Sequence, residues 1–285
     1  MSEAGVGICV RPGCDQPGLS LCASCRLVGY CCRTCQVEDW PRHKEVDCQG
    51  HIRKVGMAHL QKAKGFDQDD NFVQSLRYSE LAIVKLKQLN DRPIEAIDDA
   101  LRCKFTALNF MNQNREALEC AQERYCLYLT KHTHPPAIVA SFDLIESCIH
   151  NREFVDAELY ARTTWETITL SRDSHIPDNQ REKFTSRGAL LLAKSTFDLG
   201  ANGGIPPEEQ QETGREAITL ARRALEIETQ LHGAESIEVS ESKVTLGQVL
   251  AFFNDVEDDE VLHPSSLRAN QSPSARLFIC QRGLF

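Results

Sequence analysis

The sequence predicts a mainly α-helical protein with a small metal-bound module at its N-terminus. Cysteine and histidine residues are concentrated in the first fifty positions, in pairs with the spacing of metal ligands. From about Arg53 onward, apolar residues recur every three or four positions, as in amphipathic helices. No stretch alternates between apolar and polar residues for any length, as a half-buried strand would. We therefore expect a compact metal module followed by an all-α domain.

The N-terminal ligand-type residues form four ordered pairs. Their internal spacings are C-x4-C, C-x2-C, C-x3-C and H-x4-C. The eight residues are Cys9, Cys14, Cys22, Cys25, Cys31, Cys35, His43 and Cys48. Two such pairs complete the tetrahedral shell of one Zn²⁺, so four pairs predict two closed, structural zinc sites. The alternative, a disulfide framework, fits poorly because the chain has 13 cysteines, an odd number.

The residues around these ligands resemble the MYND zinc finger over about residues 9–48. The resemblance rests on Tyr30-Cys31, Cys35-Gln36, Asp39-Trp40 and His43-Lys44, ahead of Cys48. It implies a cross-braced fold, in which the first and third pairs share one zinc and the second and fourth pairs share the other. The first zinc is then held by Cys9, Cys14, Cys31 and Cys35, and the second by Cys22, Cys25, His43 and Cys48. The C-x4-C pair is longer than the usual C-x2-C, and the H-x4-C pair is slightly long. Cys32 has no place in the pattern.

The resemblance also implies a peptide-binding surface. In MYND fingers, the strand before the third ligand pair and the helix after it form a groove for short proline-containing segments of partner proteins. We expect a short strand at 27–30, a short helix at 36–40, and a second short helix that begins at Pro41 and carries His43. The matching groove residues are Gln36 and Trp40, one helical turn apart. Trp40 either binds such a peptide or only packs against the zinc core.

The remaining chain predicts a series of helices, separated by proline, glycine and asparagine breakers. The expected helices cover residues 71–88, 93–111, 115–130, 137–149, 153–170, 180–198, 208–231 and 235–253. We place the domain boundaries at 1–8 (flexible N-terminus), 9–48 (finger), 53–262 (helical domain) and 263–285 (irregular tail).

Three of these helices contain a weak internal repeat. Pairs of alanines four residues apart are each followed, four residues later, by a bulky residue: Ala117, Ala121 and Tyr125; Ala157, Ala161 and Trp165; Ala217, Ala221 and Leu225. Small residues at this spacing allow close helix packing in stacked repeats. Residues 221–251 resemble a tetratricopeptide repeat of the kinesin-light-chain type; another helical bundle is the alternative. The wider gap before the third pair predicts an insertion around 171–180 and 200–212.

Composition limits the function classes. The chain has 285 residues, a formal net charge of −9 and no basic stripe, which argues against direct nucleic-acid binding. It has no apolar run long enough for a membrane span and no signal-peptide pattern at its start. Cysteines that bind zinc must also be in the reduced state, as they are in a reducing compartment. We therefore expect a cytoplasmic or nuclear protein.

The other chemistry-bearing residues have simpler explanations. Cys103, Cys120, Cys126 and Cys148 fall within expected helices, where cysteine behaves as a small hydrophobe. His132 and His134 fall in a connection. The acidic run at 255–260 lacks the pattern of a calcium loop. The tail from 263 onward interrupts the repeat without a polar cap, and we expect the chain to be a shortened or alternative form of a longer protein.

Together these features predict a non-enzymatic adaptor that binds zinc and partner proteins, with the finger as one binding surface and the helical repeats as a second. Two alternatives remain. SET-and-MYND lysine methyltransferases combine similar modules, but the chain has no Asn-His-Ser-Cys stretch and no Gly-Glu-Glu near a tyrosine. A RING-type ubiquitin ligase would require a central histidine and a final C-x2-C, whereas His43 is the seventh ligand and Cys48 stands alone.

Overall fold

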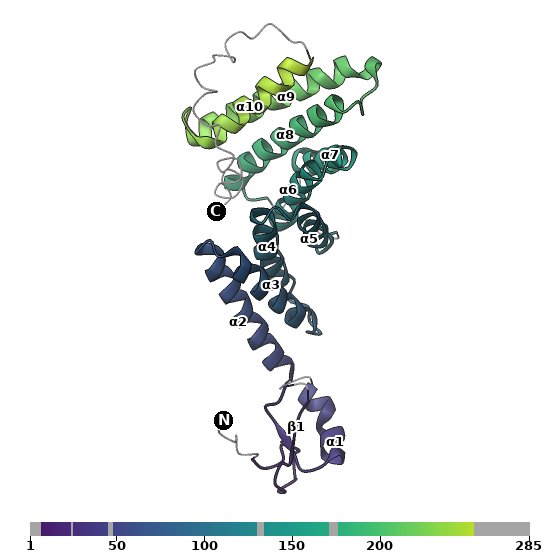
Figure 1. Cartoon of the computed structure of the whole chain (residues 1–285), viewed down its shortest axis with the longest axis vertical. Coiled ribbons are helices and arrows are strands. Elements are labelled where there is room, and N and C mark those ends of the chain that lie inside the picture. Colours follow the sequence, from purple (N-terminus) through teal and green to yellow (C-terminus); the bar gives the residue numbers. More distant parts are fainter. Residues whose placement is uncertain (1–6, 24, 45–47, 130–133, 171–175, 254–285) are drawn as a thin grey trace. The chain divides into compact units, whose positions relative to one another are not determined.

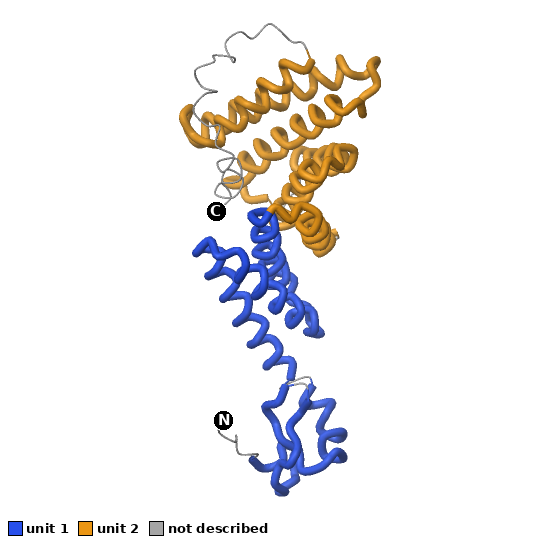
Figure 2. Tube along the Cα trace, viewed as in Figure 1, with its two compact units in different colours: residues 1–111 blue, residues 112–285 orange. Residues whose placement is uncertain are grey.

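The computed structural model describes residues 7–23, 25–44, 48–129, 134–170 and 176–253 (Figure 1). The mainly α-helical class is confirmed, because the described residues form ten helices and one two-stranded sheet. The chain divides into two compact units, residues 1–111 and 112–285 (Figure 2). None of the described helices combines the length and apolarity needed to span a membrane. The acidic run at 255–260 and the tail from 263 lie outside the described residues.

The N-terminal part of the first unit consists of two short strands and one helix. Strand β1 (Ser20–Leu21) pairs antiparallel with β2 (Gly29–Tyr30), with Ser20 opposite Tyr30. Helix α1 (Arg33–His43) follows and lies against β2. The expectation of two short helices was wrong, because Pro41 lies inside α1 rather than at the start of a new helix. Pro41 falls in the last turn of α1, where its missing N–H removes only one hydrogen bond near the helix end.

Helices α2 (Gln49–Gln68), α3 (Phe72–Lys87) and α4 (Ile94–Phe110) pack against one another. Helix α2 begins directly after Cys48, earlier than the expected start near Arg53. Gly56 allows the close approach of α2 and α3, since a Cβ atom at this position would lie 3.0 Å from Leu86 Cδ2. Phe72 and Phe110 stack with ring centroids 4.0 Å apart and so fasten α3 to α4.

The second unit contains α5 (Asn114–Cys126), α6 (Pro135–His150), α7 (Phe154–Leu170), α8 (Asp178–Ala201), α9 (Pro207–His232) and α10 (Ile237–Phe253). The alanines of the predicted repeat lie on α5, α7 and α9, and all six are at most 1% exposed. The alternating helices α6 and α8 contribute aliphatic side chains such as Ile145 and Leu192 to one shared core. The repeat is therefore a packing repeat, as its spacing predicts.

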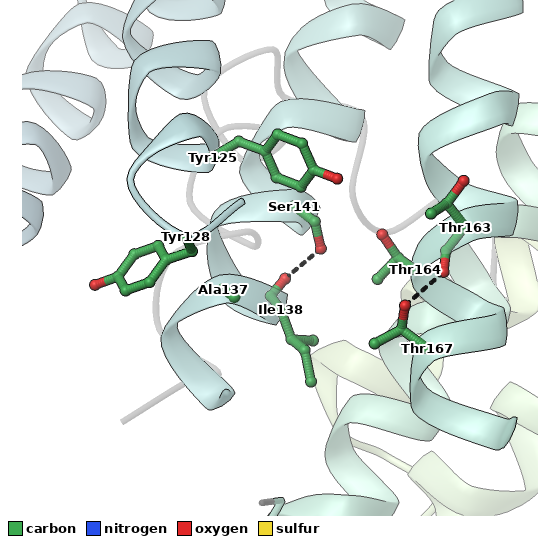
Figure 3. A pocket seen from close by; sticks show the side chains of 8 residues that line it. All are labelled: Tyr125, Tyr128, Ala137, Ile138, Ser141, Thr163, Thr164 and Thr167. Atoms are coloured by element: carbon green, nitrogen blue, oxygen red, sulfur yellow. Dashed lines mark hydrogen bonds between the residues drawn. The ribbon is translucent and has the colours of Figure 1, made fainter. Parts of the chain in front are cut away.

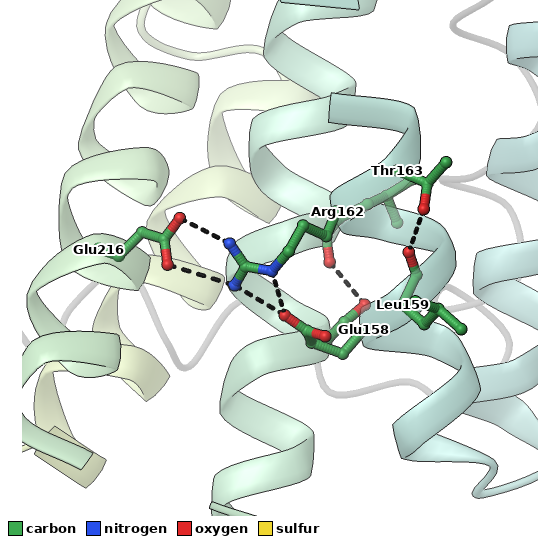
Figure 4. A network of polar contacts seen from close by, with 7 residues as sticks. Glu158, Leu159, Arg162, Thr163 and Glu216 are labelled. Atoms are coloured by element: carbon green, nitrogen blue, oxygen red, sulfur yellow. Dashed lines mark hydrogen bonds and ion pairs between the residues drawn. The ribbon is translucent and has the colours of Figure 1, made fainter. Parts of the chain in front are cut away.

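Polar contacts join the equivalent helices of successive repeats. On one side, the Arg162 guanidinium of α7 donates two hydrogen bonds to the Glu216 carboxylate of α9, at 3.0 and 3.2 Å, and one to Glu158 at 2.8 Å (Figure 4). On the other side, Arg187 of α8 contacts Glu146 of α6 and bonds to Glu241 of α10 at 3.1 and 3.2 Å. Polar contacts thus join α7 to α9 in one series of helices and α6, α8 and α10 in the other, while α5 and α7 meet through the rings of Tyr125 and Tyr160.

The additional residues of the third repeat lie mainly in helices. Helices α8 and α9 have 24 and 26 residues, whereas α6 and α7 have 16 and 17. The extended ends are covered by α10, since a Cβ atom at Gly214 would lie 2.5 Å from the ring of Phe253. Around 200–212, the added residues form the end of α8, a short loop and the first turns of α9, and most of them are exposed except Gly200 and Ile205. Residues 171–175 of the other expected insertion lie outside the described residues.

Candidate metal centre and peptide-binding surface

The first group of ligand-type residues comes from two loops and the start of α1. Cys9 and Cys14 flank a tight turn in which the Cys14 N–H bonds to the Arg11 carbonyl at 3.1 Å and Gly13 adopts a φ of +79°. This turn takes up the two extra residues of the C-x4-C pair, because glycine tolerates a positive φ without strain. Cys31 follows β2 and Cys35 lies in the first turn of α1.

The second group is more deeply buried. Cys22 and Cys25 form a tight loop between the strands, closed by a 2.8 Å bond from the Arg26 N–H to the Cys22 carbonyl. His43 ends α1, and Cys48 precedes the first residue of α2. All four of these side chains are buried. The H-x4-C pair therefore joins the last residue of α1 to the residue before α2, and residues 45–47 between them lie outside the described residues.

The two groups fit zinc in distance and in chemistry. Within each group the candidate ligand atoms all lie within 4.8 Å of one another. The Sγ atoms of Cys14, Cys31 and Cys35 are 3.3 to 3.8 Å apart. In the second group, His43 Nε2 lies 3.3 Å from Cys25 Sγ and 3.0 Å from Cys48 Sγ. A tetrahedral zinc site with Zn–S bonds of about 2.3 Å has sulfur–sulfur edges of about 3.8 Å.

The family model of the MYND finger matches residues 9–48. Residues 9–48 are a MYND finger. A MYND finger binds zinc, and its two ligand groups can hold two zinc ions. The structure brings together the two cross-braced groups that the resemblance implied, Cys9, Cys14, Cys31 and Cys35 in one and Cys22, Cys25, His43 and Cys48 in the other. Cys32 belongs to neither group and is exposed, with its Sγ 3.8 Å from that of Cys31.

A buried carboxylate fastens the helix of the finger to its sheet. The Asp39 carboxylate accepts a hydrogen bond from the Tyr30 hydroxyl at 2.9 Å and two from the Arg42 guanidinium, at 2.7 and 3.0 Å. Burial acts to raise the pKa of Asp39, but the bonds from Arg42 and Tyr30 hold it below its usual value. Asp39 and Tyr30 both belong to the sequence motif, but the hydrogen bond between them becomes visible only in the folded structure.

Arg11 is a second residue that the spacing pattern did not reveal. Its guanidinium donates to Cys35 Sγ at 3.5 Å and pairs with Glu38 of α1 at 2.8 Å. A cation beside the four-cysteine group offsets the negative charge that its thiolates carry when they bind metal. The only sequence signal was a basic residue inside the C-x4-C pair.

The two expected groove residues both lie on α1. Gln36 and Trp40 are half-buried, and Trp40 packs against the cysteine-rich core with its ring 6.1 Å from that of His43. Two apolar side chains nearby in sequence are well exposed, Leu27 (63%) just before β2 and Val37 (62%) on α1. Trp40 therefore packs inward and also presents part of its ring outward, so both expected roles fit its position.

The helical part resembles solved tetratricopeptide-like repeat structures. A kinesin-light-chain repeat protein from Podospora anserina matches with a TM-score of 0.53 and 16% identity, covering 79% of this chain and 98% of that one. BtubC (BKLC) from P. vanneervenii matches with a TM-score of 0.52 and 14% identity, covering 88% and 90%. These similarities establish the fold of the repeats. A search of curated proteins gives no match to the chain.

A small cavity lies between α5, α6 and α7 (Figure 3). Its volume is about 120 Å³, and its lining includes Tyr125, Ser141, Thr163 and Thr167. The hydroxyls of Ser141, Thr163 and Thr167 donate to carbonyls of their own helices. Ligand pockets usually measure roughly 300 Å³ or more, and a catalytic hydroxyl needs a base beside it. The cavity therefore offers no clear site for chemistry, and MYND fingers and tetratricopeptide-like repeats are typically non-catalytic interaction modules.

Proposed function

We propose that the protein is a non-enzymatic adaptor whose finger binds short proline-containing peptides through Gln36 and Trp40. The observation that carries this proposal is the position of Trp40, which packs on the zinc-site core and keeps part of its ring accessible. A partly buried indole on a rigid support offers its accessible part to a proline ring as a flat apolar surface, at a low entropic cost. Gln36, one turn earlier, can bond to the extended peptide backbone.

The helical repeats supply the second partner surface in this proposal. Stacked helical repeats typically present extended concave surfaces to polypeptides, and two weak sites on one chain raise the overall affinity for a partner that reaches both. Bound zinc ions would have a structural role, since each group offers four protein ligands, enough to fill a tetrahedral shell. We further propose protein partners rather than nucleic acid or membrane, and a cytoplasmic or nuclear location. In support, none of the described cysteines forms a disulfide.

Binding of the full chain to an array of short proline-containing peptides tests this function. Trp40→Ala should reduce binding by about tenfold or more, and Gln36→Ala by less, since an aromatic anchor contributes more than one exposed hydrogen bond. Glu38→Ala is the matched control, because Glu38 lies on α1 but pairs with Arg11. Zinc content should remain at two ions per chain in all variants. Unchanged peptide binding by Trp40→Ala would contradict the proposal and leave Trp40 a packing residue.

A further inference from the structure

Helix α2 has an unusual charge distribution for this chain. Between Gln49 and Phe66 it has no acidic residue, although the whole chain has a net charge of −9. Its basic residues in this range are Arg53, Lys54, Lys62 and Lys64, with His51 and His59 in addition. A segregated positive charge on an acidic protein creates a local field that attracts anionic partners.

Two of these cations form ion pairs with carboxylates of the described residues. Arg53 pairs with Asp91, and Lys64 Nζ lies 2.6 Å from Asp99 Oδ2 on α4. Lys54 and Lys62 are exposed, and their spacing of eight residues places them on one face of α2 with Ala58 between them. The charges of Lys54 and Lys62 on this face of α2 are therefore accessible to solvent or to a binding partner.

Helix α3 continues the same positive surface. Its Tyr78 ring lies 5.1 Å from Lys62 Nζ of α2 and 6.0 Å from the Arg77 guanidinium. Lys85 lies where α3 meets α2, since its Cβ atom would be 3.2 Å from a Cβ atom placed at Gly56. Leu81, one turn before Lys85, is 41% exposed. We call this surface the basic face; it consists of Lys54, Lys62, Arg77, Tyr78, Leu81 and Lys85.

No carboxylate among the described residues forms an ion pair with any of the four cations of the basic face. The one acidic residue of α3, Glu80, pairs with Lys104 of α4 at 3.3 Å. Beneath the face, burial together with Lys62 and Lys85 lowers the pKa of His59, and its Nδ1 atom is buried without a hydrogen bond. The positive charge of the face is thus uncompensated within the described chain.

We propose that the basic face binds a short acidic peptide segment of a partner protein, with an apolar side chain between its carboxylates. Lys54, Lys62, Arg77 and Lys85 would pair with the carboxylates, while Tyr78 and Leu81 would receive the apolar side chain. Four cations interrupted by apolar side chains match such a segment better than a nucleic acid, whose backbone presents a continuous series of phosphates to the protein. This site lies on α2 and α3 and does not involve Gln36 or Trp40.

Fluorescence anisotropy with the full-length, zinc-loaded chain tests the proposal. The probe is a fluorescein-labelled peptide of glutamates with leucine at every fourth position, and the comparison peptide has glutamine in place of glutamate. Lys62→Glu/Lys85→Glu should weaken binding of the glutamate peptide by about tenfold or more, because two attractions become two repulsions. Binding should also weaken as salt rises from about 50 to about 200 mM. In NMR titrations, the bound peptide should raise the pKa of His59.

The matched control is Arg115→Glu/Arg215→Glu, which makes the same charge change at exposed positions of α5 and α9. This control should bind the glutamate peptide as the wild type does. Circular dichroism and zinc content verify that both double variants are folded. Equal loss of affinity in the two double variants, or equal binding of the glutamate and glutamine peptides, would overturn the proposal. Tighter binding of a single-stranded RNA than of the glutamate peptide would overturn it in favour of a nucleic-acid partner.

Discussion

The finger and the repeats of α5–α10 are stabilised in different ways. In the finger, the buried core consists largely of candidate zinc ligands, together with Tyr30 and the packed side of Trp40. In the second unit, the core is a continuous apolar cluster, largely aliphatic with Phe142 and Phe184, contributed mainly by α6 to α10. One region therefore depends on a few coordination bonds, and the other on many small apolar contacts.

This difference determines how each region responds to damage. Loss of one ligand from a four-ligand site affects an entire small module, because the module has almost no other source of folding free energy. Loss of one buried methyl group in a repeat removes a modest part of a distributed total.

The largest effect is expected from Cys25→Ser in the fully buried ligand group. The variant should bind about one zinc ion per chain instead of two, and the finger should lose its order, since structural zinc contributes roughly 10 kcal/mol or more to folding. The control is Cys32→Ser, which should still bind two ions because Cys32 belongs to neither group. Metal analysis of purified protein distinguishes the two. Loss of zinc in Cys32→Ser would mean that the ligand assignment is wrong.

Leu192→Ala tests the core of the second unit. Leu192 is 0% exposed on α8, so its truncation leaves a cavity and should lower the free energy of unfolding by about 2 to 5 kcal/mol. The zinc content should stay at two. Leu170→Ala is the control, since Leu170 is 74% exposed and its truncation should cost less than about 0.5 kcal/mol. Chemical denaturation measures both, and equal losses would contradict the assigned core.

A smaller loss of stability is expected when the ion pair between Arg162 of α7 and Glu216 of α9 is removed. Glu216→Gln removes the charge that pairs with Arg162, but the two side chains are 43% and 37% exposed. Solvent screens such a pair, so the loss should be below about 1 kcal/mol at low salt and close to zero in about 1 M NaCl. Thermal unfolding at the two salt concentrations measures the effect. A loss that does not depend on salt would indicate a packing role instead.

The smallest effect, and one of opposite sign, is expected for Asp198→Asn. Burial raises the pKa of Asp198, while Lys194 and His150 oppose the shift only in part. A raised pKa in the folded state means that the ionised form costs stability at neutral pH, and that this cost disappears as the pH falls through the folded-state pKa. The variant should therefore be more stable than the wild type at pH 7 by a few tenths of a kcal/mol, and equal to it near pH 4. A less stable variant at pH 7 would contradict this sign.

Much of the architecture was predictable because it depends on local patterns. Apolar spacing located α3 to α10 within a few residues, and proline and glycine breakers marked most of their ends. The ordered ligand pairs indicated the position of the finger. The spacing of the alanine pairs indicated a packing repeat, and these alanines are buried in the structure. These signals succeed because each arises within one or two helical turns or from a fixed ligand order.

The features that sequence missed depend on contacts between distant elements. The bond between Tyr30 and Asp39 and the contact of Arg11 with Cys35 arise only when β2, α1 and the first loop meet. The continuity of α1 through Pro41 was also not evident from the sequence, because a proline can begin a new helix or lie in the last turn of the preceding one. The basic face likewise has no local sequence signal, because Arg77 and Lys85 of α3 join the cations of α2 only when the two helices pack together.

Metal maintains the finger, whereas apolar packing maintains the helices. Hydrogen exchange of the full chain with and without a strong zinc chelator separates the two. The chelator should abolish protection in residues 9–48 and leave the protection of α5 to α10 unchanged. Retained protection in the finger, or an equal loss along the whole chain, would mean that the two regions are not stabilised in these different ways.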